Sequence, residues 1–323
     1  MNGNRRVVVT GIGVVSSIGI GREKFWNNLI KGKTGISEVE LFDTTKYENH
    51  RGGEVKDFNP LDFIEKNRIK SLGRGSQFAI AAAKMALEDA GLNVKQINRD
   101  KIGAIIGTTM ADIQSLEQVD KYWTKDGEDL VWAINILKYP SNSLADHIGY
   151  FFGLQGPNYV IPTACSAGNY SIGYSFNLIR EGKVDAMIAG GADPFSRITF
   201  TGFNRLFAVA PEKCQPFDKN RKGMMVGEGA GILLIESLDI ALKRKAPIYA
   251  EILDYALSCD AHHMTAPSVG GIIQVMRRAM ENAGISPQDV DYISAHGTGT
   301  AANDKAECAA VKEVFGDRYK NIP

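Results

Sequence analysis

The chain has 323 residues, of which 44% are hydrophobic, and its 37 lysines and arginines balance 37 aspartates and glutamates. A neutral chain gives no global electrostatic reason to bind nucleic acid or an anionic membrane, so an acidic partner would need a local basic patch. The length exceeds the size at which one hydrophobic core usually keeps growing, and we therefore expect two core units.

Cysteine usage and the start of the chain indicate the compartment. The four cysteines, at 165, 214, 259 and 308, lack the paired spacing of a zinc site or a disulfide framework. The apolar run after Arg6 breaks at Thr10, which is too short for a signal peptide, and no stretch reaches the roughly 18 apolar residues of a membrane helix. These features predict a cytoplasmic protein without a membrane span.

The first elements in chain order predict an α/β unit. Residues 6–9 are apolar enough for a buried strand, and Gly11 and Gly13 predict a tight turn directly after it. A dinucleotide-binding fingerprint needs a third glycine, and Ser16 stands in its place, so we do not expect nicotinamide binding.

A charged, irregular excursion follows at 22–75, with short helices expected at 24–30 and 60–64. The spacing of apolar residues then predicts an amphipathic helix over 77–89. Gly91 should end this helix, because glycine readily adopts the left-handed backbone found at helix C-termini.

An internal repeat indicates that the chain is built from two equivalent halves. Each copy ends a helix, crosses a polar loop into a strand, at 102–106 or at 290–295, and reaches a Gly-Thr turn at Gly107 or Gly297. Four residues recur with a displacement of 193 positions (279 minus 86): Ala86, Glu88, Ala90 and Gly91 match Ala279, Glu281, Ala283 and Gly284. The shared order of elements predicts two α/β halves.

The boundary between the halves is expected near residue 247. Further strands are predicted at 184–188 and 232–235, and residues 248–256 predict the first strand of the second half. We therefore expect an N-terminal half at 1–247 and a partial C-terminal half at 248–323.

Cys165 lies between an apolar segment at 159–161 and a helical pattern at 171–179, so it should stand at a strand-to-helix turn. Unpaired amide N–H groups and the helix dipole favour the thiolate there, and the thiolate is the form that attacks. This placement predicts a catalytic nucleophile in the N-terminal half. The alternative interpretation is a small thiol that packs a tight turn.

His296 ends the predicted strand 290–295 and precedes a Gly-Thr turn, which is where α/β proteins place reactive groups. The alternative is a histidine whose hydrogen bonds only stabilise the turn. The remaining histidines, at 50, 147, 262 and 263, lack the spacing of metal ligands.

Five groups of motifs stand in a fixed order and span residues 8–307. They are Val8-Val9-Thr10-Gly11-Ile12-Gly13, Thr163-Ala164-Cys165-Ser166-Ala167-Gly168, Gln215-Pro216-Phe217-Asp218 with Gly227-Glu228-Gly229-Ala230-Gly231, His263-Met264-Thr265-Ala266-Pro267, and Ala295-His296-Gly297-Thr298-Gly299-Thr300 with Asp304 and Glu307. Together they resemble the β-ketoacyl-acyl carrier protein synthases, and above all the type II elongating ketosynthases.

The resemblance implies a thiolase-like α/β fold, with two pseudo-equivalent halves in α-β-α-β-α layers and an incomplete second half. It implies an acyltransferase of fatty-acid or polyketide-like chain elongation that performs a decarboxylative Claisen condensation. Cys165 would hold the acyl group as a thioester, and its backbone N–H would stabilise the oxyanion on the acyl carbonyl. His296 would donate a hydrogen bond to the enolate formed from the malonyl group.

The same resemblance implies the partners of the enzyme. They are acyl carrier protein with acyl and malonyl groups on phosphopantetheine, and a second copy of the chain in a homodimer. No organic cofactor or metal is implied.

Other positions take their expected roles from the matching motifs. Thr298 and Thr300 match contacts to the pantetheine arm, although their hydroxyls also suit turn stabilisation. Thr265 belongs to a loop beside the malonyl entrance, and His263 is expected to hold that loop rather than to transfer protons. The supporting carboxylates Asp304 and Glu307 complete the motif, and Glu307 is expected to organise waters or ligands rather than to act as a base.

The turn 107–112 departs from the family, which usually has a more glycine-rich turn beside the acyl pocket. Met110 is expected to contact the acyl chain, and Met110 and Asp112 together are expected to alter the chain length or shape that is accepted.

A carrier protein is acidic, so a local basic patch is expected on this chain. The candidates are Lys66, Arg68, Lys70 and Arg74. A solvated charged face is the alternative interpretation.

The family's second catalytic histidine, which follows a Lys-Ser segment, is absent from the 323 residues. Loss of one oxyanion donor costs about a hundredfold to a thousandfold in rate. We therefore expect either a fragment of a complete synthase or an N-terminal piece that awaits a complement, and in both cases a chain that is inactive alone. Two alternatives remain: a non-catalytic partner resembling a chain-length factor, which the presence of Cys165 disfavours, and a thiolase-like enzyme acting on coenzyme A esters, for which a second reactive cysteine is not visible.

Overall fold

The structure is a computed structural model that describes residues 5–126, 138–263 and 265–323. The chain forms two compact units. Unit 1 comprises Met1–Ser37, Gly53–Thr199 and Gly227–Ile252, and unit 2 comprises Glu38–Gly52, Phe200–Val226 and Leu253–Pro323.

Unit 1 contains a mixed sheet, which in the described part of the chain has seven strands. Their order is β2-β1-β8-β7-β5-β6, and β9 also pairs with β1. Strand β5 runs parallel to β6 and to β7, whereas β8 is antiparallel to β1 and to β7. The bounds are β1 Val7–Ser16, β2 Gly19–Ile20, β5 Ile102–Gly107, β6 Asn158–Ile161, β7 Ala186–Asp193, β8 Gly229–Ser237 and β9 Ala250–Ile252.

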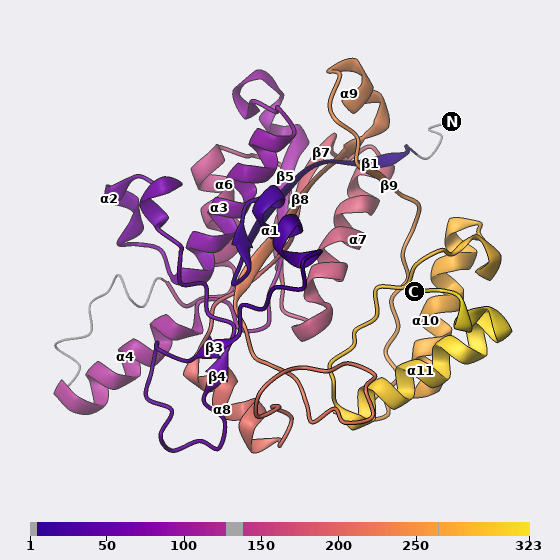
Figure 1. Ribbon diagram of the computed structural model, residues 1–323. Helices are drawn as coiled ribbons and strands as arrows, with labels where there is room; N and C mark the ends of the chain where they lie inside the picture. The colour runs from indigo at the N-terminus through magenta and orange to yellow at the C-terminus, as the bar shows by residue number, and fades with distance from the viewer. Residues whose placement is uncertain (1–4, 127–137, 264) are drawn as a thin grey trace. The chain divides into compact units, whose positions relative to one another are not determined.

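Helices cover both faces of this sheet (Figure 1), with α3 (Arg74–Asp89) and α6 (Ser143–Phe152) on one side and α7 (Ala167–Arg180) on the other. Helix α3 is rich in alanine, a strong helix former whose small side chain lets the helix lie close to the strands. The described part of unit 1 also contains the helices α1 (Arg22–Leu29), α2 (Lys66–Ile69), α4 (Ile113–Asp126) and α9 (Leu238–Lys243), and short 3₁₀ helices at Pro60–Asp62, Val94–Gln96, Arg99–Lys101 and Ala164–Ser166.

The expected turn at Gly11 and Gly13 is wrong, because β1 continues through both residues. A Cβ on Gly11 would lie 2.0 Å from the Ala86 carbonyl oxygen, and one on Gly13 would lie 1.8 Å from the Ala82 carbonyl oxygen. The two glycines therefore allow α3 to pack directly on the strand, which is a packing requirement and not turn chemistry.

Unit 2 contains α10 (Val269–Ala283) and α11 (Ala301–Phe315), which pack against each other. The sequence boundaries between the units fall inside two elements, α8 (Arg197–Arg205) and the strand β3 (Ser37–Glu38). Strand β3 pairs with β4 (Arg51–Gly52). Short 3₁₀ helices lie at Pro287–Asp289 and Gly316–Lys320.

The helix ends of the internal repeat are confirmed. Gly91 follows α3 with φ +61°, and Gly284 ends α10 with φ +67°, so both glycines adopt the left-handed conformation.

Two strand predictions for the second half are wrong. Residues 290–295 have no assigned strand, and the N–H of Ile293 donates to the carbonyl of Pro323 at 3.0 Å. The expected strand 248–256 is reduced to β9, which pairs with β1 in the sheet of unit 1. An extended segment becomes a strand only when a neighbour offers a ladder of hydrogen bonds, and β1 offers it to β9.

Candidate active site

Cys165 lies at the predicted strand-to-helix turn. Strand β6 ends at Ile161, a single 3₁₀ turn covers Ala164–Ser166, and α7 begins at Ala167. The thiol is exposed and is not part of a disulfide. The local backbone is strained, because Ala164 has φ +52°, a conformation that L-residues adopt at a cost of about 1–3 kcal/mol. The sequence therefore forms a sharp elbow that presents a thiol beside the N-terminus of a helix.

The carboxyl ends of three neighbouring parallel strands lie side by side at this elbow. Gly107 at the end of β5 pairs with Ile161 of β6 and with Gly191 of β7. The N–H of Thr108 donates to the Ile161 carbonyl at 3.2 Å. A Cβ on Gly107 would lie 2.3 Å from the backbone of Ala167. The turn after β5 is thus packed directly against the first residue of α7.

The turn 107–112 is held by buried polar groups. Asp112 is buried and accepts hydrogen bonds from the N–H of Gly75 at 2.6 Å, and from the N–H of Ser76 at 3.2 Å and its hydroxyl at 2.5 Å, at the start of α3. Burial raises the pKa of the Asp112 carboxyl, and the bonds from Ser76 and Gly75 oppose that rise. Burial also raises the pKa of Asp193, which binds the same turn. Asp112, which belongs to the turn that departs from the family, therefore anchors that turn to α3.

In unit 2, the carboxylate of Glu307 holds the backbone around His296. Its Oε1 accepts the His296 N–H at 2.7 Å and its Oε2 accepts the Gly297 N–H at 3.0 Å. Glu307 itself is only 7% exposed, whereas His296 is exposed. The side chain of Asn303 also donates to Glu307, at 3.2 Å. Helix α11 thus fixes the backbone from which the imidazole projects.

Asp304, one turn earlier on α11, holds the rest of the same loop. Its carboxylate accepts the N–H of Phe217 at 2.7 Å and the N–H of Gly299 at 3.1 Å, and Arg221 lies 3.5 Å away. Gly299 has φ +74°, and a Cβ there would lie 2.6 Å from the Gly223 carbonyl oxygen. Both supporting carboxylates therefore accept hydrogen bonds from backbone amides of the loop, and Asp304 also joins the loop to the segment of Phe217.

The two threonines of the loop bond to each other. The hydroxyls of Thr298 and Thr300 are 2.9 Å apart, and the Thr300 N–H donates to the Thr298 hydroxyl at 3.3 Å. The carbonyl of Thr298 accepts a bond from the Cys214 thiol at 3.3 Å. Burial, and then the charge of Asp304, raises the pKa of the Cys214 thiol, which suits a donor rather than a nucleophile.

The loop of His263 also makes local hydrogen bonds. The Thr265 N–H donates to His263 Nδ1 at 3.1 Å, and the carboxylate of Asp260 accepts the N–H groups of Ser268 at 2.8 Å and His262 at 3.2 Å. Met264, part of the matching motif, lies outside the described residues.

The four basic candidates for a carrier-binding patch differ in their surroundings. Lys66 and Lys70 are exposed, and Arg68 lies over the rings of Tyr150 and Phe151, 5.2 Å from each centroid. Arg74, by contrast, forms an ion pair of 2.7 Å with Glu228, whose side chain has no exposed surface. Its guanidinium is thus engaged inside unit 1.

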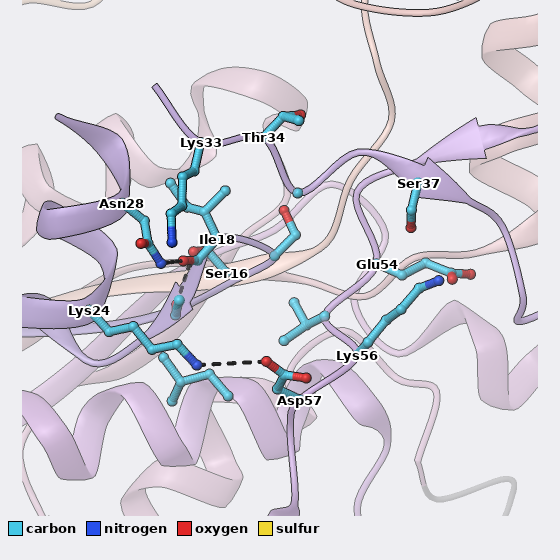
Figure 2. A pocket seen from close by; sticks show the side chains of 15 residues that line it. Ser16, Ile18, Lys24, Asn28, Lys33, Thr34, Ser37, Glu54, Lys56 and Asp57 are labelled. Atoms are coloured by element: carbon cyan, nitrogen blue, oxygen red, sulfur yellow. Dashed lines mark hydrogen bonds and ion pairs between the residues drawn. The ribbon is translucent and has the colours of Figure 1, made fainter. Parts of the chain in front are cut away.

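A polar cavity of about 270 Å³ lies beside the hairpin β1–β2 (Figure 2). Three lysines line it, but Lys24 pairs with Asp57 at 3.6 Å, the Asn28 amide donates to the Ile18 carbonyl, and the Ser16 hydroxyl donates to the Gly19 carbonyl. The Asn28 bond joins α1 to the hairpin, and the Lys24 pair joins α1 to the segment of Asp57, so we assign these polar groups a structural role and no reaction.

Two features are absent from the part of the chain that the structure describes. In that part of the chain, no cluster of histidine, cysteine and carboxylate side chains suits a metal ion. The same residues contain no helix long and apolar enough to cross a membrane.

Sequence reasoning missed Asp193 and the ion pair of Arg74 with Glu228. Asp193 ends an apolar strand, and the end of a predicted strand is the signal that identified His296, so the sequence contained the same signal for Asp193. Glu228 stands in a glycine-rich run with no such signal, and only the fold brings it to Arg74.

The chain is similar to known proteins along its whole length. Residues 4–241 match the family "Beta-ketoacyl synthase, N-terminal domain", and residues 249–323 match "Beta-ketoacyl synthase, C-terminal domain". The chain is 38% identical over 330 residues to "3-oxoacyl-[acyl-carrier-protein] synthase 2" of Staphylococcus aureus (strain COL), covering 100% of the chain and 80% of that protein. A protein of the same name from Synechocystis sp. is 36% identical, covering 98% and 79%.

Solved structures show the same relationship. "The ishigamide ketosynthase/chain length factor" superposes with a TM-score of 0.94 at 41% identity, over 97% of this chain and 78% of that one. A chain of "AntDE:AntF (apo): type II PKS acyl-carrier protein in complex with its ketosynthase bound to the hexaketide" gives a TM-score of 0.90 at 33% identity, over 99% of this chain and 80% of that one. These likenesses confirm the expected thiolase-like α/β fold class. The chain belongs to the beta-ketoacyl synthase family of acyl-transferring enzymes.

Proposed function

We propose that the protein is a 3-oxoacyl-[acyl-carrier-protein] synthase, which condenses a carrier-bound malonyl group with an acyl group held on Cys165. The observation that carries this proposal is an exposed thiol at a strained strand-to-helix elbow, in a chain that matches both domains of the family. Curated relatives that cover nearly the whole chain have this name.

The proposed reaction begins with attack of the Cys165 thiolate on the carbonyl carbon of an acyl thioester. The thiol of the carrier's pantetheine arm leaves, and the backbone N–H of Cys165 stabilises the oxyanion in between. A malonyl thioester then loses carbon dioxide, and the resulting enolate attacks the acyl carbon on Cys165 and releases the thiolate. His296 donates a hydrogen bond to the oxygen of that enolate. Glu307 contributes by fixing the His296 backbone.

The remaining roles belong to the same proposal. Thr298, Thr300 and Thr265 contact the pantetheine arm and the malonyl group, and Met110 contacts the acyl chain. The halves 1–247 and 248–323 contribute the nucleophile and the imidazole respectively. The protein works in the cytoplasm as a homodimer, with acyl carrier protein as its partner.

The proposal is tested by incubating the protein with acyl carrier protein thioesters and digesting it. The peptide that contains Cys165 should gain the mass of the acyl group, and the gain should be reversed by hydroxylamine, which cleaves thioesters. An unmodified Cys165 peptide in folded protein, under conditions that load a known synthase of this family, would contradict the proposal.

Loading should depend on charge at the exposed lysines near α2. Carrier proteins are acidic, so Lys66→Glu combined with Lys70→Glu should slow loading by about tenfold at low salt through a weaker encounter, with little effect at high salt. The measurement is the loading rate against ionic strength. Lys243→Glu, at an exposed lysine on α9, is the matched control and should load normally. An equal loss in both variants would show that these lysines are a solvated face without a specific role.

A further inference from the structure

Asp193 ends strand β7 and binds three consecutive residues of the turn after β5. Its Oδ1 accepts bonds from the Thr108 hydroxyl at 2.8 Å, the Thr109 N–H at 2.8 Å and the Met110 N–H at 3.2 Å. A carboxylate that accepts several backbone N–H bonds is a strong and directional anchor. One side chain therefore determines the course of the backbone through Thr108, Thr109 and Met110.

The rest of the turn depends on the same anchor. The Thr108 hydroxyl that donates to Asp193 also accepts the N–H of Ala111 at 2.8 Å. Ala111 has φ +49°, a conformation that a non-glycine residue keeps only when its surroundings impose it. The hydroxyl of Thr199 lies 3.2 Å from the Met110 sulfur, so the thioether is also held in place.

This turn lies next to the elbow that carries Cys165, through the register of the sheet. Thr108 bonds to Ile161, the last residue of β6, and Gly107 packs against Ala167, the first residue of α7. Cys165 stands between Ile161 and Ala167 in the chain, on the 3₁₀ turn of the elbow. A shift of the turn would therefore move the Met110 side chain relative to any group attached to the Cys165 sulfur.

We propose that Asp193 is a positioning residue that fixes the turn 108–111 and the Met110 side chain beside Cys165, and thereby sets the lengths of chain that can be attached to the thiol. This inference deepens the proposed function, because on that proposal the attached chain is the acyl substrate. Asp193 itself does not touch the reacting atoms.

The test uses a probe that requires only the thiol. N-alkyl chloroacetamides with a butyl or a dodecyl chain react by attack of the Cys165 thiolate on the chloromethyl carbon, which forms a carbon–sulfur bond and releases chloride. The measured quantity is the ratio of the two alkylation rates at Cys165, followed by mass spectrometry. Asp193→Ala should change this ratio by about tenfold or more, since small displacements near a reacting group have large effects on rate.

Conservative and control variants separate positioning from a general loss of structure. Asp193→Asn keeps an oxygen acceptor at the same position, and its ratio of alkylation rates should be close to that of the wild-type protein. Thr199→Val, which is close in shape and lacks the hydroxyl, should change the ratio in the same sense as Asp193→Ala but by less. Asp185→Ala removes a carboxylate that pairs with Arg5 just before the other end of β7, and it should leave the ratio unchanged.

An unchanged ratio in folded Asp193→Ala would overturn the inference. Should Asp193→Ala fail to fold, an unchanged ratio in Thr199→Val would overturn it equally. The proposed function fails separately: a protein whose alkylation depends on chain length and on Asp193, but which never accepts an acyl group from a carrier, refutes the condensing activity and leaves the role of Asp193 intact.

Discussion

Replacing Cys165 with serine is expected to slow acyl loading by at least about a thousandfold, because a serine hydroxyl is scarcely ionised at neutral pH and is a much weaker nucleophile than a thiolate. The elbow itself should be preserved, since serine has nearly the same shape and the neighbouring Ser166 already donates its hydroxyl to the Thr163 carbonyl at 2.9 Å. The loss should therefore be chemical and not structural. Loading is measured by the mass of the intact protein against time with an acyl carrier protein thioester.

The matched control is Cys259→Ser, which changes another exposed thiol, in unit 2. It should load at the normal rate. If Cys165→Ser still gained the acyl mass at a comparable rate, or if Cys259→Ser abolished loading, the nucleophile would have to be reassigned.

Replacing Glu228 with alanine is expected to lower the free energy of unfolding by about 3–5 kcal/mol, because it leaves a partly buried cation and two buried amides without their acceptor. The carboxylate pairs with Arg74 through both oxygens, at 2.7 and 2.9 Å, and accepts the N–H groups of Val55 at 2.8 Å and Phe195 at 2.9 Å. The Glu228 side chain has no exposed surface, so water cannot replace these bonds without local opening.

Urea unfolding followed by circular dichroism measures this loss, and Glu65→Ala is the control. Glu65 pairs with Arg68 at 3.3 Å on the surface, where such pairs contribute below about 1 kcal/mol. Similar small losses in both variants would show that the cluster around Glu228 is hydrated and contributes little.

The local sequence predicted the elements whose neighbours are close in the chain. The segment around Cys165 combines a β-branched strand with a helix of small and apolar residues, and the structure confirms the elbow between them. Helix α3 and the left-handed glycine that follows it were also predictable, because helix periodicity and C-terminal capping are properties of a few consecutive residues.

Predictions that depended on distant partners were less successful. The glycines of β1 looked like turn residues, but their role is to admit α3, which lies about 70 residues further along the chain. Residues 290–295 have the composition of a strand, yet a strand needs a ladder partner that composition does not reveal.

The candidate site divides along the same line. Residue types and motif order by themselves determined the family, the thiol at the elbow and the histidine before a Gly-Thr turn, because each rests on a short run of neighbouring residues. Only the tertiary structure decided that Arg74 forms an ion pair with Glu228. It also decided that Glu307 binds the backbone of His296 and that Asp193 binds the turn that contains Met110. Hydrogen bonds and ion pairs act over about 3 Å, so their partners are chosen by the folded backbone and not by separation along the chain.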